Sequence, residues 1–371
     1  MKFIKHLLIV LSVSLVLGFV LSAGISSAKP LDQVIEGAKN EGTVTAKLKT
    51  TLSVHSMKRL EREIKEKFGV DLNIIFSPSG SMGKDAAQAI MEQKAGATPS
   101  YDLESFHSGH ISDAMNNAPG IFEIVNWKSL ITEDTNPDVL SEQPIVSPSY
   151  YSGGQGLLYN PDKISGAEVP KTLNDLADPK WKGKVGIWRS TDAWSRWAFV
   201  LGKEKAFSEL RAIIRNNSIQ GRYADLFNRY MLGEIWMALT KASYMTEAQT
   251  KGMPAAWQSL DYLDVRETVL VVRKGARHPN AAKLVALYLV TPAGAKFMLE
   301  EGSAGTLFYP GNYEHEVLSQ TKKQGVRIIY TEREPKILEF EASKENSRWK
   351  KEVKLILDTG GGKIQKKKKK T

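Results

Sequence analysis

The chain has 371 residues, no cysteine and a formal net charge of +10. A single hydrophobic core stops growing near ~250 to 300 residues, so we expect two domains or one large split domain. The lack of cysteine excludes a disulfide framework, a thiolate nucleophile and a lipid anchor attached to a cysteine.

The positive charge lies mostly at the two ends of the chain. Lys2 and Lys5 carry two of the positive charges and the lysines of residues 363–371 carry six, so residues 29–362 have a net charge of only +2. A nucleic-acid-binding domain would show a basic face, which a nearly neutral body argues against. We interpret residues 363–371 as a disordered Lys-rich tail and expect no nucleic-acid partner.

Residues 1–28 have the features of a secretory signal peptide. Lys2 and Lys5 precede an uncharged run, and small residues fill positions 26–28, where a peptidase would cut. The alternative is an uncleaved anchor, because about 20 apolar residues are enough to span a membrane. The small residues favour cleavage, so we expect a periplasmic or extracellular protein without a lipid anchor.

Helix and strand patterns alternate along the first part of the chain. The spacing of Leu60, Ile64 and Phe68 predicts a helix that ends at Gly69. Strands that alternate with helices pair in parallel, which predicts an α/β fold. The expected helices cover 31–39, 55–68 and 84–94, and the expected strands cover 43–54, 70–76 and 101–106.

The later part of the chain contains further elements of both kinds. We expect strands over 156–159, 184–188 and 267–275, and helices over 193–215, 222–239, 279–290 and 292–301. No repeat of 20 to 50 residues is visible, which excludes a solenoid.

Residues 170–188, PKTLNDLADPKWKGKVGIW, place Lys171, Lys182 and Lys184 around Trp181 and Gly183. They suit either a phosphate site or a structural joint. Thr172 followed by Asp175 caps a short helix, and Gly183 turns the chain into a strand. We therefore favour a joint, with Trp181 buried and the lysines solvated.

Four ordered segments resemble the extracellular solute-binding proteins of ABC importers, in their ferric-iron-type branch. The similarity covers nearly all of residues 29–310. The segments are YNPDKI (159–164), VPKTLNDLADPKWKGKVGI (169–187), GEIWMAL (233–239) and VVRKGARHPNAAKLVALYLVTPAGAKFM (271–298).

The resemblance implies a bilobed periplasmic-binding-protein type II fold, with two α/β lobes joined by two crossover segments and a ligand in the cleft. The crossings should lie near 146–154 and 262–269. We accordingly assign 29–145 to the first part of lobe 1 and 146–265 to lobe 2. Residues 266–362 then form the return segment of lobe 1 and the C-terminal helices.

Two helix starts are candidate anion sites, because unpaired N–H groups and the helix dipole favour negative charge there. Arg189 could add a bidentate pair with a carboxylate or phosphonate. The alternative for both is an ordinary helix cap. The first site comprises Ser79, Gly80 and Ser81, and the second comprises Trp188, Arg189, Ser190 and Thr191.

The ferric branch implies a metal held by two adjacent tyrosines after GEIWMAL, with His and Glu from the first lobe. Here Tyr244 stands between Ser243 and Met245, so the tyrosine pair is broken. His55, His107 and Tyr244 remain an alternative metal set, although the histidines equally suit a cleft wall or a helix cap. We expect Tyr150 and Tyr151, at the first crossing, to lie over an organic solute.

Motifs typical of enzymes are missing: G-x-S-x-G, H-E-x-x-H, G-x-x-x-x-G-K-[ST] and G-x-G-x-x-G do not occur. We predict a monomeric solute-binding component of an ABC transporter, without cofactor, that captures a small organic anion and delivers it to a membrane permease. The first alternative is a ferric iron-binding protein of an ABC importer. The second is a secreted hydrolase that uses His107 or His110.

Overall fold

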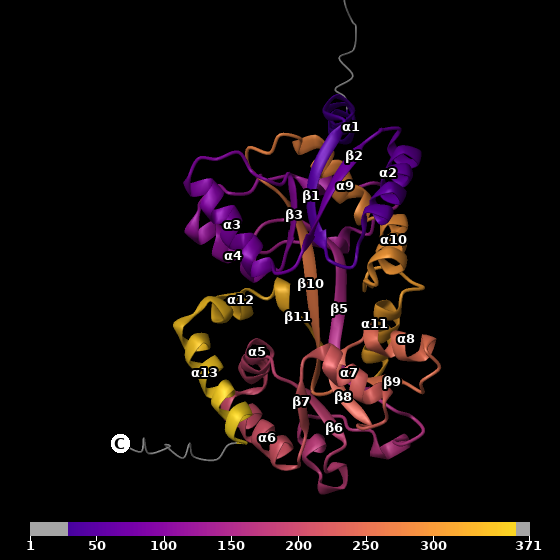
Figure 1. The fold of residues 1–371 in the computed structure, drawn as a ribbon, viewed down its shortest axis with the longest axis vertical. Coiled ribbons are helices and arrows are strands. Elements are labelled where there is room, and N and C mark those ends of the chain that lie inside the picture. Colours follow the sequence, from indigo (N-terminus) through magenta and orange to yellow (C-terminus); the bar gives the residue numbers. More distant parts are fainter. Residues whose placement is uncertain (1–28, 361–371) are drawn as a thin grey trace, which may run out of the picture.

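The computed structural model describes residues 29–360, which form two α/β lobes stacked end to end (Figure 1). This arrangement confirms the predicted fold class. The predicted signal peptide, residues 1–28, and the Lys-rich tail, residues 363–371, lie outside the described residues.

Three parallel strands are at the centre of the first lobe. β1 (Thr43–Lys49) lies between β2 (Asn73–Ser79) and β3 (Leu103–Phe106) and pairs in parallel with both, as the alternation of elements predicted. The helices of this lobe are α1 (Pro30–Glu41), α2 (Val54–Phe68), α3 (Met82–Lys94), α4 (Ser108–Asn117), α9 (Pro279–Leu289) and α10 (Pro292–Gly302).

Local sequence signals set the ends of these helices. The Ser56 N–H donates to the Ser53 side chain at 3.1 Å, which caps the start of α2. Gly69 ends α2 with a φ of 67°, a left-handed conformation that favours glycine. Pro279 and Pro292 stand in the first turns of α9 and α10, where a missing N–H costs no hydrogen bond.

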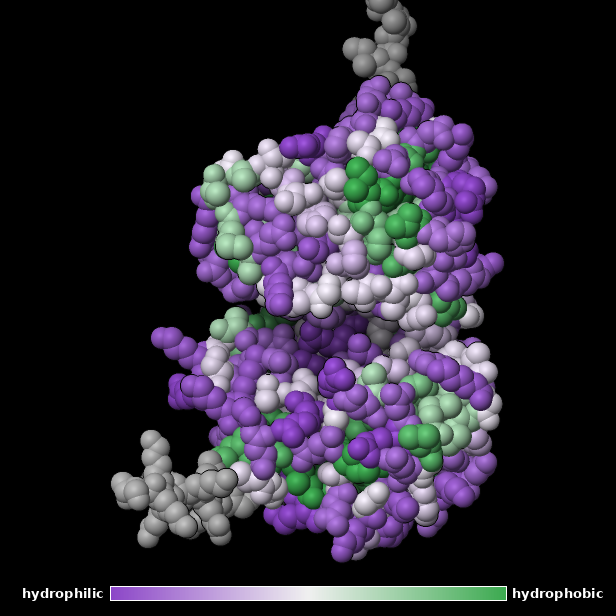
Figure 2. Space-filling view, in the orientation of Figure 1, coloured by the Kyte–Doolittle hydropathy of each residue, from purple (hydrophilic) through white to green (hydrophobic). Residues whose placement is uncertain are grey.

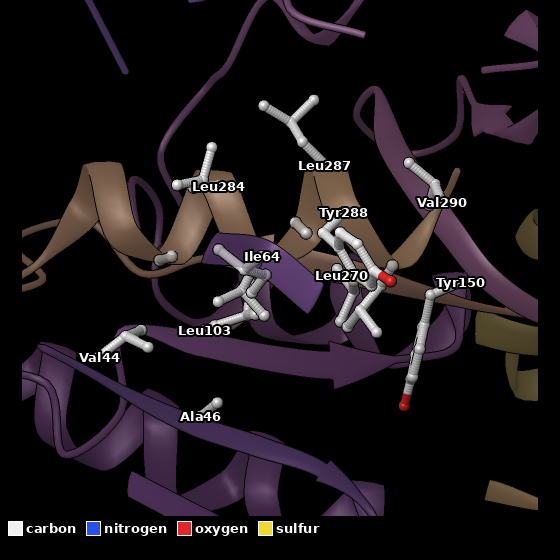
Figure 3. Packing of buried hydrophobic residues seen from close by; sticks show 14 of the residues in the cluster. Val44, Ala46, Ile64, Leu103, Tyr150, Leu270, Leu284, Leu287, Tyr288 and Val290 are labelled. Atoms are coloured by element: carbon white, nitrogen blue, oxygen red, sulfur yellow. The ribbon is translucent and has the colours of Figure 1, made fainter. Parts of the chain in front are cut away.

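Apolar side chains cover both faces of this sheet. On one face, residues of α2 and α9 such as Ile64 and Leu284 pack against Leu103 and Leu270 (Figure 3). On the other face, α3 and α4 pack through a second cluster that includes Ile111. Within residues 29–360, no single helix is long and apolar enough to cross a membrane; α9 and α10 pass that test only as a pair bent by 85°.

The second lobe has its own sheet and core. Its strands are β6 (Val185–Trp188), β7 (Ile219–Gly221), β8 (Met237–Lys241) and β9 (Ala256–Gln258). Its helices are α5 (Thr191–Leu201), α6 (Lys203–Arg215), α7 (Tyr223–Met231), α8 (Ser243–Thr250), α11 (Tyr313–Lys323), α12 (Pro335–Ala342) and α13 (Lys344–Thr359).

Two helix predictions in this lobe were wrong. The helix expected over 193–215 is two helices, α5 and α6, because Gly202 adopts a φ of 93° between them. The helix expected over 222–239 ends at Met231, and residues 237–241 form the strand β8. Four consecutive residues of β8 are buried, and such a short apolar run has no periodicity that separates a strand from a helix.

Two long strands carry the sheet through both lobes. β5 (Ser147–Tyr159) and β10 (Tyr262–Val272) pair in antiparallel fashion, and together they give the strand order β2-β1-β3-β10-β5-β8-β6-β7. Two short strands flank them: β4 (Leu140–Ser141) pairs with β5 and β11 (Arg327–Tyr330) with β10. The predicted crossings near 146–154 and 262–269 fall within these two strands.

The core residues locate where each strand changes lobe. Tyr150 and Leu270 belong to the core of the first lobe, whereas Leu157 and Tyr262 belong to the core of the second. Residues 303–312 also connect the lobes, because they lead from α10 to α11. The C-terminal helices α12 and α13 pack on the second lobe, a placement that our division of the chain left open.

The lysine-rich stretch 170–188 is a structural joint, as predicted. Trp181 is 4% exposed and belongs to the core of the second lobe. Lys171 and Lys182 are exposed, and the Lys184 ammonium lies over the ring of Trp236. Packing of the tryptophan rather than ligand binding explains this stretch.

The stability of the second lobe should depend on Trp197. This side chain is fully buried between Trp188 and Tyr262, with ring centroids 6.0 and 4.7 Å away. We expect Trp197→Ala to lower the free energy of unfolding by about 3 to 5 kcal/mol, since it leaves a large cavity. Leu232→Ala is the control, because Leu232 is 74% exposed. Urea unfolding followed by circular dichroism measures both, and equal midpoints would contradict the predicted core.

Candidate functional site

A cavity of about 310 Å³ lies between the two lobes at the level of β5 and β10. Figure 2 shows the hollow between the lobes and the hydrophilic surface inside it. Lys49 at the end of β1 and His107 before α4 contribute from the first lobe. Lys241 at the end of β8 and Ser190 before α5 contribute from the second. Side chains at strand ends and helix starts therefore surround this space, as is typical of ligand sites in α/β folds.

A groove of about 430 Å³ continues from the cavity along α8. Lys49, Lys241 and Ser243 line both the cavity and the groove, whereas Tyr244 lines the groove but not the cavity. The cleft is thus longer than the cavity and has room for a solute that extends beyond the two lysines.

The two lysines lack carboxylate partners. Lys49 Nζ donates to the carbonyl oxygen of Gly302 and to Thr51 Oγ1, both at 2.8 Å. Lys241 Nζ lies 5.2 Å from the ring centroid of Tyr223. Neither ammonium forms an ion pair with a carboxylate of residues 29–360.

The pKa values of the lysines reflect this environment. Burial, together with the charge of Lys241, lowers the pKa of Lys49 to about 8. Lys241 is open to solvent within the cleft but has both lobes around it. Burial lowers its pKa, Arg266 adds to the effect, and Glu314 opposes it. The cleft therefore holds two like charges that an anion would stabilise.

Glu314, on α11, lines the cavity together with the two lysines. It is 2% exposed and accepts a hydrogen bond from the Gly154 N–H at 2.8 Å. Burial raises its pKa to about 8, against the opposing effects of the Gly154 N–H and Lys241. At neutral pH the side chain is therefore protonated, and it supplies no counter-charge to the lysines.

Two arginines line the cavity but are already neutralised. Arg196 Nε and Nη2 donate to Asp264 at 3.1 and 3.0 Å, and Nη1 donates to Glu341 at 3.0 Å. Arg266 pairs with Glu332 at 2.7 Å and lies 3.4 Å from Glu341. These buried contacts compensate both guanidinium groups within the protein.

Three predicted site residues line the cavity: His107, Tyr151 and Ser190. Burial, with Arg266 as a second cause, lowers the pKa of His107 well below its ordinary value, so its ring is neutral. His107 Nδ1 lies 2.6 Å from the carbonyl oxygen of Glu267. The role of these three residues in ligand binding stays a prediction.

Four predicted residues near the cavity do not line it. Tyr150 and Trp188 are each 1% exposed and belong to the cores of the two lobes. Arg189 points outward and pairs with Asp358 on α13, which corrects our expectation of an anion-binding guanidinium in the cleft. Thr191 is half-buried at the start of α5 but does not reach the cavity. Alternation along β5 explains why Tyr150 is buried while its neighbour Tyr151 lines the cavity, because successive side chains of a strand face opposite sides.

The first predicted helix start is an ordinary cap. Ser79 Oγ donates to Asp85 at 2.6 Å, and the Lys84 N–H donates to the Ser81 hydroxyl at 3.4 Å. Gly80 is exposed. None of the three lines the cavity, so the alternative interpretation explains this segment.

The alternative metal set is not brought together. His55 is exposed at the start of α2, and the cavity is lined by His107 but not by Tyr244. Tyr244 lies in the groove, where its ring stacks on Phe227 at 4.6 Å. Among residues 29–360 there is no group of three or more His, Asp or Glu side chains placed to hold a metal ion.

Sequence reasoning missed the residues that give the site its charge. Lys49 ends β1, but the sequence pattern extended this strand to residue 54, so the rule that ligands lie at strand ends did not identify it. Lys241 ends β8, which the periodicity placed in a helix. Glu314 and Arg266 gave no local signal, because their positions depend on contacts between distant segments.

Comparisons with known proteins agree on the type of molecule. A family model described as a bacterial extracellular solute-binding protein matches residues 118–325. No curated protein sequence matches.

Several solved structures share the fold. Iron-bound HitA from Pseudomonas aeruginosa is 19% identical, with a TM-score of 0.62 over 84% of this chain and 99% of HitA. FutA from Trichodesmium, in complex with iron and citrate, is 17% identical, with a TM-score of 0.59 over 87% of this chain and 100% of FutA. AfuA from Actinobacillus pleuropneumoniae, with fructose-6-phosphate bound, is 17% identical, with a TM-score of 0.59 over 85% of this chain and 98% of AfuA.

The buried Glu314 generates a prediction about pH. Its folded-state pKa of about 8 lies above the ordinary 4.5, so the folded protein binds an extra proton between these values. Stability should therefore fall as pH rises through this window, by about 1.4 kcal/mol for each pH unit, and level off above it. Glu314→Gln keeps the acceptor for Gly154 and should remove this slope.

Urea unfolding of both proteins at several pH values between 5 and 9 measures the difference. We expect the variant to gain stability relative to the natural protein as pH rises toward 8. Parallel pH profiles for the two proteins would show that the carboxyl group ionises freely in the folded state.

Proposed function

Because this chain belongs to the family of bacterial extracellular solute-binding proteins, we propose that it captures a small organic anion, a carboxylate or phosphonate, in the cleft between its lobes. It would deliver this solute to the membrane permease of an ABC importer. The observation that carries the proposal is the pair of ammonium groups, Lys49 and Lys241, which face one cavity from opposite lobes without a carboxylate partner.

Other features of the cavity support an organic solute. Tyr151 and Tyr223 offer ring surface, and Ser190 and Ser243 offer hydroxyl donors. The side-chain oxygen of Gln155 is buried and has no hydrogen-bond partner within the described part of the chain. A ligand hydroxyl or amine would satisfy this acceptor, whose burial is otherwise unfavourable.

Ferric iron is the second candidate, and the chemistry of the cavity favours it less. Fe³⁺ prefers anionic oxygen ligands. Burial raises the pKa of Tyr151, and it raises the pKa of Tyr223 to about 12, so both phenols hold their protons. Glu314 is also protonated, and two ammonium groups repel a cation. A hydrolase is less favoured still, because within the described residues no Ser or Thr hydroxyl hydrogen-bonds to His107 or His110 as an activated nucleophile would.

Closure of the lobes is the first expected consequence of binding. A ligand shifts the population toward the closed state only if it contacts both lobes, as a solute between Lys49 and Lys241 would. We expect small-angle X-ray scattering to show a smaller radius of gyration in the presence of saturating ligand. An unchanged radius at saturation would contradict a cleft that closes on its solute.

A second prediction concerns the chemical class of the ligand. In a thermal-shift screen of metal-stripped protein, we expect phosphonates or short carboxylates to raise the melting temperature more than ferric citrate does. Lys241→Met should weaken binding of the effective anion at least about tenfold, or about 1.4 kcal/mol, because it removes one of the two ammonium groups that would hold the anion between the lobes. Arg189→Ala is the control, since this outward-facing arginine should leave affinity unchanged.

An opposite result would promote the iron-binding alternative. A visible charge-transfer band with ferric iron, lost in Tyr151→Phe or Tyr244→Phe but retained in Lys241→Met, would contradict the anion proposal. Turnover of a candidate ester or glycoside by the protein would contradict a purely binding role.

A further inference from the structure

We propose that the solute carries a phosphoryl group with two negative charges, a phosphate monoester or a phosphonate, seated between Lys49 and Lys241. The proposal rests on the proposed anion-binding function and specifies the charge and the place of the head group. It follows from counting which cations of the cleft are already neutralised and which are not.

The arginines of the cavity have internal counter-charges. Asp264 and Glu341 hold Arg196, and Glu332 and Glu341 hold Arg266, at distances between 2.7 and 3.4 Å. A ligand that replaced these contacts would leave buried carboxylates unpaired, at a high cost in free energy. The arginines therefore shape the wall of the cavity and leave the anion to other groups.

The lysines have no such compensation. Asp192, at the rim of the cavity, is paired with Lys350 on α13. Glu314 is buried against Gly154 and protonated. Two positive charges thus remain at one end of the cavity, and a monoanion would neutralise only one of them.

The position of the lysines suits one compact group better than two separate charges. They come from opposite lobes, yet each lines both the cavity and the adjoining groove, so they converge where the two spaces meet. The charge of Lys241 is the second cause, after burial, of the lowered pKa of Lys49, in keeping with two ammonium groups that line the same two spaces. A tetrahedral dianion between them would offset this repulsion and would keep both lysines in their charged ammonium form.

Neutral donors surround the same point. Ser243 and Ser303 line both the cavity and the groove beside the lysines. Ser243 is also the first residue of α8, so the positive end of the helix dipole lies at this wall. Phosphoryl oxygens accept several hydrogen bonds, and hydroxyl groups with an adjacent helix start suit them. The rest of the solute would occupy the cavity toward Gln155 and Tyr223.

Pairs of small probes that differ by one negative charge test this assignment on the full chain at pH 7.5, where a phosphate monoester, with a second pKa of about 6, is a dianion. Methyl phosphate is compared with dimethyl phosphate, methylphosphonate with its monomethyl ester, and succinate with succinamate, by isothermal titration calorimetry. We expect the dianionic member of one or both phosphorus pairs to bind at least about tenfold more tightly than its monoanionic partner. The two phosphorus pairs distinguish a phosphate monoester from a phosphonate.

Lysine variants test whether the preference for dianionic over monoanionic probes comes from Lys49 and Lys241. Lys49→Met and Lys241→Met should each reduce it to less than about threefold, whereas Lys241→Arg, which keeps the charge, should retain it. Lys182→Met is the matched control, because Lys182 is exposed in the joint at 170–188. Circular dichroism of each variant without ligand shows whether it is folded.

Each other outcome overturns a distinct claim. Equal binding of both members of the phosphorus pairs, or discrimination that survives in both Lys→Met variants, contradicts the phosphoryl assignment and leaves the anion-binding function standing. Discrimination confined to succinate against succinamate also contradicts it, because the two charges would then lie on separate carboxylates. Failure of every anion to bind, with ferric iron binding instead, contradicts the proposed function itself.

Discussion

The antiparallel pair formed by β5 and β10 is the constraint on which the rest of the structure depends. Both strands run from the core of one lobe into the core of the other, and their register holds Arg266 opposite Gly153 and Glu267 opposite Ser152 at the waist. Between the two cores, these strands carry polar residues, and Ser152, Gln155 and Arg266 among them line the cavity. The wall of the cavity is that polar interval, which is why the site lies at the crossing and nowhere else along these strands.

The C-terminal segment of the chain decides which positive charges of the cleft have a carboxylate partner. The C-terminal segment brings Glu332 and Glu341 to the arginines of β10 and α5, so these cations are compensated within the protein. No corresponding carboxylate reaches Lys49 or Lys241 within residues 29–360. The fold therefore decides which cations of the cleft have a carboxylate partner, and a count of basic residues in the sequence does not reveal that.

The sequence predicted the architecture better than the site, for physical reasons. Alternating periodicities identified the parallel strands of the first lobe. The direction of each side chain was harder to predict. Tyr150 and Tyr151 are adjacent on β5, but Tyr150 is buried in the core while Tyr151 lines the cavity. Two identical side chains carry no signal of which face is which, and only the register of the sheet decides it. Arg189 was misplaced for a related reason, because its direction is set by Asp358 on a distant helix.

The C-terminal segment also limits how the lobes move. α12 packs against α4 of the first lobe and α5 of the second, on one side of the cleft (Figure 1). The Ser108 N–H at the start of α4 donates to Glu332 at 2.8 Å, and both groups are buried. Opening the lobes on this side would leave a buried donor and a carboxylate with one partner fewer, at a cost of about 1 to 3 kcal/mol. A solute that bridges Lys49 and Lys241 would add a second contact between the lobes to this one, and its differential affinity for the closed state would shift the population toward that state.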